Sequence, residues 1–235
     1  MAHEFPGTVM HALDRPVWAS LTTCHAGFSA GDARARRYLP DINLFASARD
    51  DTQAGLEALA ALVRPGEQVY VLQVPVIGTP PCLTAVKRGR GLQLVARSGA
   101  RFHASLAEIT RLTEADAPEM LALATLTEPG PFLARTHAMG SFLGIRIDGR
   151  LVAMAGERFR FPGYTEVSGV CTHPDFRGRG LARNLSAAVS AHIVARGETP
   201  FLHAWASNLP AISLYESLGF EARTEVDAAI FCSRE

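Results

Sequence analysis

The chain has 235 residues, of which 48% are hydrophobic and 20% charged, and its 23 basic and 23 acidic residues give a formal net charge of zero. A chain this apolar can form a sizeable core, which excludes an intrinsically disordered protein, and a nucleic-acid-binding protein would show an excess of basic residues. The length allows one large domain or two of roughly 100 to 130 residues.

The four cysteines are far apart in the sequence and contain no Cys-x-x-Cys pair. This spacing is typical of free thiols in a reducing cytoplasm rather than of a disulfide framework or a zinc site. The first residues lack the basic and apolar pattern of a signal peptide, and no apolar run reaches the ~20 residues that span a bilayer. We therefore expect a soluble cytoplasmic protein with no membrane association.

In the first hundred residues, short apolar runs between turn residues predict strands and one helix. We expect strands at 17–22, 42–48, 69–74 and 92–96. The helix follows Asp50-Asp51-Thr52, whose side-chain oxygens can cap its N-terminus. Its apolar face consists of Leu56, Leu59, Ala60 and Val63.

The pattern begins again near residue 105. A strand is expected at 106–112, and a helix starts after it with Pro118 in the first turn, where a missing N–H costs nothing. Asp148-Gly149 predicts a type I′ hairpin turn. The elements expected around and after this turn are strands at 141–147, 150–157 and 164–172, a helix from 181 to Arg196-Gly197, a strand at 200–206, a helix between Asn208 and Gly219, and a strand at 224–231.

A basic turn with two glycines joins the strand at 164–172 to the helix at 181: Arg177-Gly178-Arg179-Gly180-Leu181-Ala182. The glycines let main-chain N–H groups approach a ligand closely, and the helix N-terminus and the arginines supply positive charge. This combination predicts a pyrophosphate site. The turn has neither the Gly-Lys-Ser/Thr of a P-loop nor the Gly-x-Gly-x-x-Gly of a dinucleotide fold.

The hexapeptide 177–182 resembles the acyl-CoA signature Arg/Gln-x-x-Gly-x-Gly/Ala of the GNAT superfamily of N-acyltransferases. Two further motifs are similar to that family: Asn208 followed by Ala211 and Tyr215, and Leu218-Gly219-Phe220. The resemblance implies an α/β (α+β) fold, in which a mixed, mostly antiparallel sheet is flanked by helices, with a catalytic domain at 105–235.

The first half, 1–104, is interpreted as a smaller, degenerate GNAT-like domain. Its order of strand, helix, strand and strand is a reduced copy of the second half. The sequence 47–51 occupies the place of a phosphate-binding turn but has no glycine, and its two carboxylates would repel a pyrophosphate. The two-part arrangement resembles glycine N-acyltransferases, and an unrelated α/β cap remains the alternative for this half.

The resemblance implies acetyl-CoA as donor and no metal. The residues that it places at the cofactor are Val170, Cys171, Thr172, Arg177, Gly178, Arg179, Gly180, Leu181, Ala182, Asn208 and Tyr215. The Val170 N–H is expected to polarise the thioester carbonyl. No covalent enzyme intermediate is needed, so Cys171 is interpreted as a small strand residue rather than a nucleophile.

Glu166 is the predicted general base, because the register of the strand matches a catalytic glutamate of the family. Shielding by Tyr164, Val167 and Phe161 is expected to raise its pKa. A solvated glutamate at the strand edge is the alternative, and Glu157 is the alternate base. Tyr215 matches the family's general acid, and a packed core tyrosine is the competing interpretation.

The acceptor is expected to be a small-molecule amine or an amino acid. Its predicted wall consists of Phe132, Arg135, His137 and Glu157, with structural packing as the alternative for Phe132. The oligomeric state stays open, with a homodimer among the options. A non-catalytic acyl-CoA-binding regulatory module is the alternative function. RNA binding through 177–180 is disfavoured, because no aromatic platform surrounds it, and the histidines lack metal-ligand spacing.

Overall fold

The computed structural model describes residues 11–105 and 109–233. Eight strands form one sheet in the order β4-β11-β5-β10-β9-β8-β7-β6. These strands are β4 (Gln68–Gln73), β5 (Leu83–Ala96), β6 (Ile109–Leu112), β7 (Phe142–Ile147), β8 (Arg150–Phe161), β9 (Tyr164–Thr172), β10 (Thr199–Trp205) and β11 (Phe220–Ser233). Neighbouring strands are antiparallel except β9 and β10, which are parallel. A mixed, mostly antiparallel sheet is thereby confirmed.

A second, three-stranded antiparallel sheet lies in the first half. It consists of β1 (Ser29–Gly31), β2 (Ala35–Tyr38) and β3 (Ala46–Ala48). The helices are α1 (Pro16–Leu21), α2 (Gln53–Ala60), α3 (Ala117–Thr127), α4 (Leu181–Ala195) and α5 (Leu209–Ser217), with short 3-10 helices η1 (Ala12–Asp14), η2 (Ala26–Phe28), η3 (Glu114–Asp116), η4 (Thr136–Met139) and η5 (Pro174–Phe176). Among the described residues, no helix has the length and hydrophobicity needed to cross a membrane.

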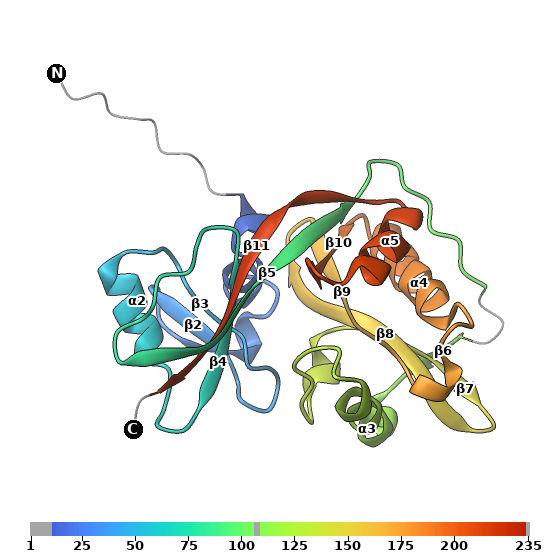
Figure 1. Ribbon diagram of the computed structural model, residues 1–235, viewed down its shortest axis with the longest axis horizontal. Coiled ribbons are helices and arrows are strands. Elements are labelled where there is room, and N and C mark those ends of the chain that lie inside the picture. The colour runs from blue at the N-terminus through green and yellow to red at the C-terminus, as the bar shows by residue number, and fades with distance from the viewer. Residues whose placement is uncertain (1–10, 106–108, 234–235) are drawn as a thin grey trace.

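The two halves of the chain exchange strands in the large sheet. β5 belongs to the first half but lies between β10 and β11, and β11 belongs to the second half but lies between β4 and β5. In Figure 1, β5 and β11 run as a long pair from the part that carries α2 to the part that carries α4 and α5. Each half therefore completes the sheet of the other.

The same local unit occurs in both halves, which supports the prediction of a GNAT-like first half. Helix α4 joins the parallel strands β9 and β10, and α2 joins β3 to β4, which are linked by a parallel bridge between Phe45 and Tyr70. β10 then pairs antiparallel with β5, and β4 pairs antiparallel with β11. The division at 104/105 itself stays a prediction.

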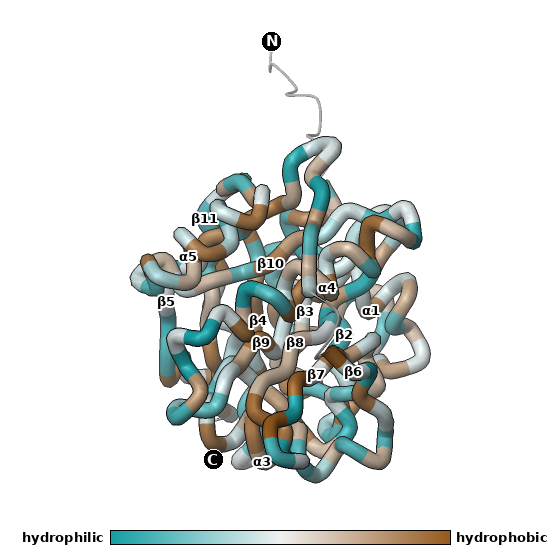
Figure 2. Tube along the Cα trace, turned by 90° about the vertical axis from the view of Figure 1, so that its right-hand side faces the viewer, coloured by the Kyte–Doolittle hydropathy of each residue, from teal (hydrophilic) through white to brown (hydrophobic). Residues whose placement is uncertain are grey.

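The core lies on both faces of the sheet. On one face, Leu185, Val189 and Ile193 of α4 pack against β7, β8, β9 and β10. On the other face, α3 covers one end of the sheet, and α1 with its neighbours covers the middle. Figure 2 shows hydrophobic segments concentrated along the central strands and α3, with hydrophilic turns around them. The face opposite α4, which carries the predicted acceptor residue Phe132, is called the acceptor face below.

The second half follows the sequence closely. β9 has the predicted bounds, and α4 ends at Arg196 with Gly197 in the left-handed region (φ +75°). Asp148 and Gly149 both have positive φ, as a type I′ turn requires. The strand predicted at 106–112 is β6, which starts at residue 109, and 106–108 lie outside the described residues.

Three predictions for other segments were wrong. Residues 17–21 belong to helix α1 rather than to a strand, because Pro16 starts the helix and Val17, Ser20 and Leu21 are buried at helical spacing. The strand at 42–48 shortens to β3. β5 begins at Leu83 rather than 92, because its polar first part pairs along the whole length of β11.

Candidate active site

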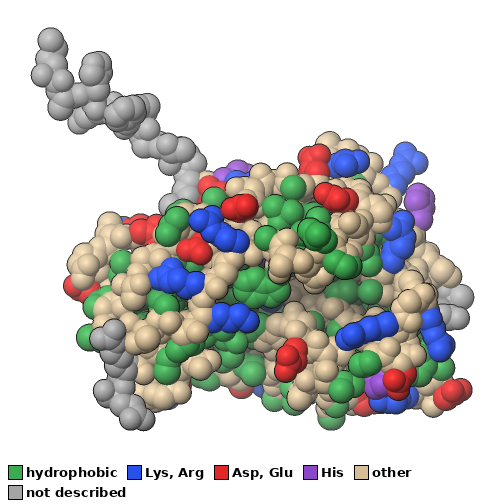
Figure 3. Space-filling view, in the orientation of Figure 1, with side chains coloured by type: hydrophobic (Ala, Val, Ile, Leu, Met, Phe, Trp, Pro, Cys, Tyr) green, Lys and Arg blue, Asp and Glu red, His purple; other side chains and the backbone are tan. Residues whose placement is uncertain are grey.

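The parallel strands β9 and β10 separate along their length. They pair only from Tyr164 to Glu166 on β9 and from Thr199 to Phe201 on β10. Beyond these residues, β9 continues along β8 to Thr172, and β10 continues along β5 to Trp205. The two strands thus leave a β9–β10 opening, and the predicted cofactor residues Val170, Cys171 and Thr172 lie on the part of β9 beyond the pairing. The space-filling view is hollowed over β9 and β10 (Figure 3).

At the end of β9 the chain makes the predicted glycine turn into α4. Gly178 and Gly180 lie in the left-handed region (φ +76° and +73°), and Gly180 is the N-cap of α4. A Cβ at either glycine would meet no heavy atom within 4 Å, so the turn is open on its outer side. Arg177 and Arg179 are exposed, and the Arg179 guanidinium lies over the Phe176 ring. The outer side of the turn and both exposed arginines therefore face open space, while the Arg177 N–H donates to the Pro174 carbonyl at 3.3 Å.

The turn is fixed to the sheet by His173. Its N–H donates to the Val152 carbonyl at 2.8 Å, and its Nδ1 accepts from the Asp175 N–H. Its Nε2 lies 2.6 Å from an Arg150 nitrogen. His173 therefore has a structural role in this turn. The described residues hold no cluster of His, Cys, Asp or Glu suited to a metal ion.

The end of β9 also fits a bound pantetheine arm. The Thr172 hydroxyl is buried and has no hydrogen-bond partner within the described residues, so a ligand with polar groups would satisfy it. Cys171 points to the other side and packs with α3. Burial raises the pKa of its thiol to about 11, which keeps the thiol protonated and agrees with its predicted non-nucleophilic role.

A β-bulge interrupts β9 in front of the turn. Met154 lies opposite Cys171 and Gly156 opposite Ser168, so that Gly169 and Val170 together face Ala155. Gly169 has φ +62°. Bulges re-aim the chain locally, and this one includes Val170, the predicted donor to the thioester carbonyl.

Glu166 lies where β9 and β10 separate, and it is completely buried. Arg158 of β8 forms a bidentate ion pair with it, with both N···O distances at 2.7 Å. His203 Nδ1 of β10 lies 2.7 Å from Glu166 Oε1. Neither partner was assigned to Glu166 from the sequence.

The expected raised pKa of Glu166 was wrong. Burial opposes ionisation of the carboxyl, but the Arg158 charge and the hydrogen bonds from Arg158 and His203 outweigh it and lower the pKa to about 2. The carboxylate therefore stays ionised at neutral pH. The ionisation of Glu166 is therefore controlled by the Arg158 guanidinium and not by the neighbouring Val167 and Tyr164.

Arg158, Glu166 and His203 form a hydrogen-bonded polar group, which continues through Gln93 to β5. Gln93, also completely buried, places its amide nitrogen 3.0 Å from His203 Nε2 and donates to the Leu13 carbonyl. Its amide oxygen accepts from Arg223. The sequence offered one signal for His203: it follows Phe201 by two residues on a strand, so both side chains lie on one face.

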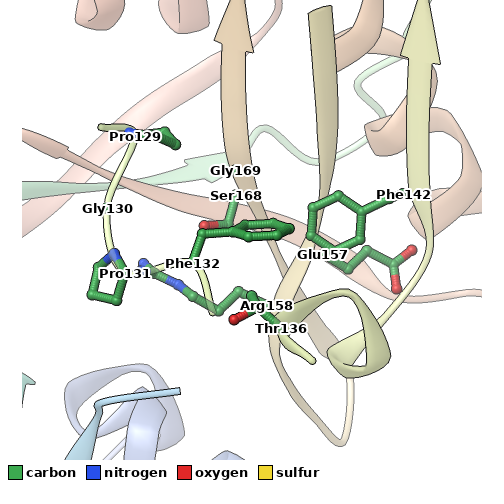
Figure 4. Close-up of a pocket in the computed structure, with 10 residues that line it drawn as sticks. All are labelled: Pro129, Gly130, Pro131, Phe132, Thr136, Phe142, Glu157, Arg158, Ser168 and Gly169. Carbon is green, nitrogen blue, oxygen red and sulfur yellow. The ribbon is translucent and has the colours of Figure 1, made fainter. Parts of the chain in front are cut away.

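A small hollow adjoins the bulge on the acceptor face (Figure 4). It is lined by Pro129, Gly130, Pro131, Phe132, Thr136, Phe142, Glu157, Arg158, Ser168 and Gly169. Phe132 and Phe142 meet edge to face with ring centroids 5.6 Å apart. In Figure 4, Arg158 extends toward Pro131, and the Glu157 carboxylate turns to the opposite side.

The structure separates the four predicted acceptor residues. Phe132 and Glu157 line the hollow, and Glu157 is buried and paired with Arg196 at 2.8 Å. Arg135 lies outside it, exposed, and pairs with Asp41. The His137 Nδ1 is buried without a partner in the described chain. Two of the four predicted acceptor residues, Phe132 and Glu157, therefore line the hollow.

Tyr215 and Asn208 belong to α5. The Asn208 side chain accepts from the Ala211 N–H and caps the helix, as predicted. Tyr215 packs against the α4-side core, with its ring 6.1 Å from that of Phe220. Burial, with the Glu166 charge, raises the pKa of the phenol to about 12, so the phenol carries its proton at neutral pH.

In the described part of the first half, a side chain occupies the corresponding place. At the ends of β3 and β4, the buried Arg15 donates to the Ala48 carbonyl and to the Gln73 side chain, and it pairs with Asp51. Gln73 also donates to Asp51. A cationic side chain thus fills the place that corresponds to the β9–β10 opening.

Comparison with known proteins gives consistent matches. The model of the FR47-like protein family matches residues 142–228. The structure of a GNAT-family protein from Novosphingobium aromaticivorans is 42% identical, with a TM-score of 0.90, over 96% of this chain and 100% of that one. A GCN5-related N-acetyltransferase from Kribbella flavida has the same fold at 19% identity (TM-score 0.64, 97% of both chains). No curated protein matches the sequence.

Proposed function

We propose, from the premise that this chain belongs to the GNAT family of acetyltransferases, that it transfers an acetyl group from acetyl-CoA to a primary amine of a small molecule or amino acid. The observation that carries the proposal is the β9–β10 opening, which ends in the glycine turn and the N-terminus of α4. The amine would attack the thioester directly in a ternary complex.

The turn would hold the pyrophosphate. The main-chain N–H groups from Gly178 to Ala182 and the positive end of α4 suit a dianionic group, and the exposed side chains of Arg177 and Arg179 add charge. Main-chain groups of Val170, Cys171 and Thr172 would bind the pantetheine arm, with Asn208 at the start of α5 beside it. The partnerless Thr172 hydroxyl supports this assignment.

The donor supplies an activated acetyl group when it is bound. The Val170 N–H, next to the bulge, would stabilise the charge that develops on the carbonyl oxygen. Tyr215 would hold the proton that the departing thiolate needs, and its raised pKa keeps that proton in place. The amine proton would pass to the polar group that contains Glu166, on the acceptor face.

The acceptor would bind on the face opposite α4. The hollow beside the bulge is small and partly aromatic, which supports a small acceptor rather than a macromolecule. The 104/105 division, the likeness to glycine N-acyltransferases and the roles of Arg135 and His137 stay predictions. A non-catalytic acyl-CoA-binding module is the competing function.

A two-step screen tests the proposal. Amines and amino acids are first ranked by the shift in melting temperature that they cause in the presence of CoA. The best are then incubated with acetyl-CoA, and release of the CoA thiol is followed. We expect thiol release that depends on both enzyme and amine. Binding of acetyl-CoA without release for any amine favours the non-catalytic module.

A further inference from the structure

The Arg158 guanidinium keeps hydrogen-bond donors that its ion pair does not use. Its Nε and Nη2 donate to the two carboxylate oxygens of Glu166, both at 2.7 Å. An arginine carries five N–H donors in a planar fork, and this pair engages one from each of these nitrogens. Nη1 has no hydrogen-bond partner among the described residues and is not one of the buried unpaired atoms, so solvent reaches it. Both donors of Nη1 are therefore available to a ligand.

This edge of the guanidinium belongs to the hollow beside the bulge. Arg158 lines the hollow, and in Figure 4 its side chain extends toward Pro131, another lining residue. The guanidinium also lies over the rings of Phe45 and Phe159, 4.9 and 4.5 Å from their centroids. The two rings and Glu166 hold the cation in one position. A group that is already fixed loses little conformational entropy when a ligand binds to it.

Ser168 supplies a second free donor in the same hollow. It lies on β9 directly before Gly169, and its hydroxyl has no hydrogen bond within the described residues and is not a buried unpaired atom. The other hydroxyl of the lining, that of Thr136, is engaged: it donates to the Ile42 carbonyl at 2.6 Å and accepts from the Leu133 N–H. The free polar groups of the hollow are therefore donors, set against a wall of proline and phenylalanine side chains.

The two nearby carboxylates do not oppose an anion in the hollow. Glu157 lines the hollow, but its carboxylate pairs with Arg196 at 2.8 Å and turns to the opposite side in Figure 4. Glu166 is completely buried behind Arg158 and is not a lining residue. An anionic group that enters the hollow thus meets the Arg158 guanidinium and the Ser168 hydroxyl first.

We infer that Arg158 and Ser168 bind a carboxylate of the acceptor, which makes the acceptor an amino acid rather than an amine without an acidic group. This inference rests on the proposed function and deepens it, because it names the class of acceptor and its orientation. The planar fork of an arginine matches a carboxylate in charge-assisted hydrogen bonds. The hollow extends to Gly169, beside Val170, so the amine end of the bound acceptor lies toward the bulge.

The first test compares acceptors on the parent protein. The panel consists of the common α-amino acids, β-alanine and γ-aminobutyrate, each matched by its amide, which has the same amine and no carboxylate. We expect kcat/KM for the best acid to exceed that for its amide by at least about tenfold, as charge-assisted hydrogen bonds imply. Binding is measured separately, by the shift in melting temperature in the presence of CoA. Amides that bind and react as well as the acids overturn the inference.

Arg158→Lys tests the fork itself. Lysine keeps a positive charge beside Glu166 but cannot hold two carboxylates in a planar fork. We expect the KM of the acid to rise by about ten- to a hundredfold, while the KM of its amide and the acetyl-CoA affinity change little. A purely structural role of Arg158 would affect acid and amide alike. Arg160→Lys is the control, since Arg160 lies on the same strand, pairs with Glu198 and does not line the hollow.

Ser168→Ala covers the case in which Arg158→Lys does not fold. The Ser168 side chain is half-buried and has no hydrogen bond to lose within the described chain, so the alanine variant should keep the parental melting temperature. We expect the KM of the acid to rise by about three- to tenfold, the worth of one hydrogen bond, with unchanged acetyl-CoA affinity. A parental KM for the acid in this variant overturns the inference.

These outcomes separate the inference from the proposed function. A parent protein that binds acetyl-CoA but acetylates no member of the panel contradicts the proposed function, and the melting-temperature shifts still show whether acids bind in preference to their amides. A parent protein that acetylates amines without preference for a carboxylate leaves the proposed function intact and overturns the binding role of Arg158 and Ser168.

Discussion

Gly180 lies at the point where a phosphate would meet the first N–H groups of α4. Gly180→Asp should abolish acetyl-CoA binding without unfolding the protein. Aspartate tolerates the left-handed region better than most residues, and a Cβ there meets no atom within 4 Å, but its charge opposes the pyrophosphate.

Gly197 is the matched control for this change. It has nearly the same φ (+75°) and equally open surroundings, and it lies at the other end of α4. Calorimetry should therefore show parental acetyl-CoA affinity for Gly197→Asp and none for Gly180→Asp. Equal affinities in the two variants would remove the turn from the cofactor site.

Substitution of Tyr215 distinguishes a chemical role of this residue from a packing role. Tyr215→Phe keeps the ring against Phe220 and removes the proton donor, so turnover should fall by about ten- to a thousandfold with unchanged acetyl-CoA affinity. Steady-state rates and melting temperatures are measured on the same sample. A lower melting temperature with normal turnover per folded molecule supports the packing role.

The Arg158–Glu166 pair predicts a pH-dependent stability. The pKa of Glu166 is lowered to about 2 in the folded state, so its stabilising contribution is present above the ordinary glutamate pKa and is lost as pH falls toward 2. Arg158→Met removes the guanidinium from a buried carboxylate, which keeps only its contacts with His203 and the Phe159 N–H, and should cost about 3 to 5 kcal/mol of unfolding free energy at pH 7.

The difference in unfolding free energy between the parent and Arg158→Met should become smaller at lower pH, because the carboxyl of Glu166 in the variant can then be protonated. Urea unfolding at pH 7 and pH 4 measures it. Arg160→Met is the control, since Arg160 is 41% exposed beside Glu198 and should lose less. A deficit for Arg158→Met that is the same at both pH values would contradict the burial of an ionised pair.

At the scale of the element, the bulge in β9 sets the direction of the Val170 N–H. Gly169→Ala places a Cβ 3.0 Å from Phe142 Cε1 at a residue with φ +62°. The left-handed conformation costs roughly 1 to 2 kcal/mol for a residue with a Cβ, and relief of the contact would flatten the bulge. We expect kcat to fall more than the acetyl-CoA affinity.

Gly163→Ala separates the backbone cost from the bulge. Gly163 has φ +82° in the turn before β9, and a Cβ there meets nothing within 4 Å. The unfolding free energy of Gly163→Ala should fall by about the same amount as that of Gly169→Ala, while its kcat stays at the parental value. Equal kcat values for both alanine variants would contradict a role for the bulge.

Sequence patterns predicted the structure correctly where the conformation of a segment depends mainly on its own residues. The turn 177–182, the hairpin at Asp148-Gly149 and the bounds of β9 follow from glycine positions and alternation. Residues 17–22 misled, because a short apolar run fits a strand or a buried helix equally well. The ionisation of Glu166 depends on Arg158 and His203, which reach it from two other strands, and no local pattern carries that contact.

For the whole molecule, strand exchange makes each half dependent on the other. The fragment 105–235 lacks β5, which separates β10 from β11 in the sheet, so it should not fold alone. Co-expression with 1–104 should restore a folded complex, measured by circular dichroism and by acetyl-CoA binding. A stable, cofactor-binding fragment would show that the catalytic half is self-sufficient.

We expect a single cofactor site among the described residues. Arg15 fills the corresponding place between β3 and β4, so calorimetry of the parent should give one acetyl-CoA per chain. A stoichiometry of two would place a second site in the first half and contradict the closed arrangement around Arg15.

A single-turnover experiment tests the central claim, direct transfer from acetyl-CoA in the β9–β10 opening to an amine. Enzyme in excess over acetyl-CoA is mixed with or without the amine selected by the screen, quenched, and assayed by mass spectrometry for CoA, acetylated amine and acetylated protein. The account predicts equal amounts of CoA and acetylated amine when amine is present, and intact acetyl-CoA with unmodified Cys171 when it is absent. Acetyl-CoA that binds but is never consumed, or an acetyl group on Cys171, would contradict it.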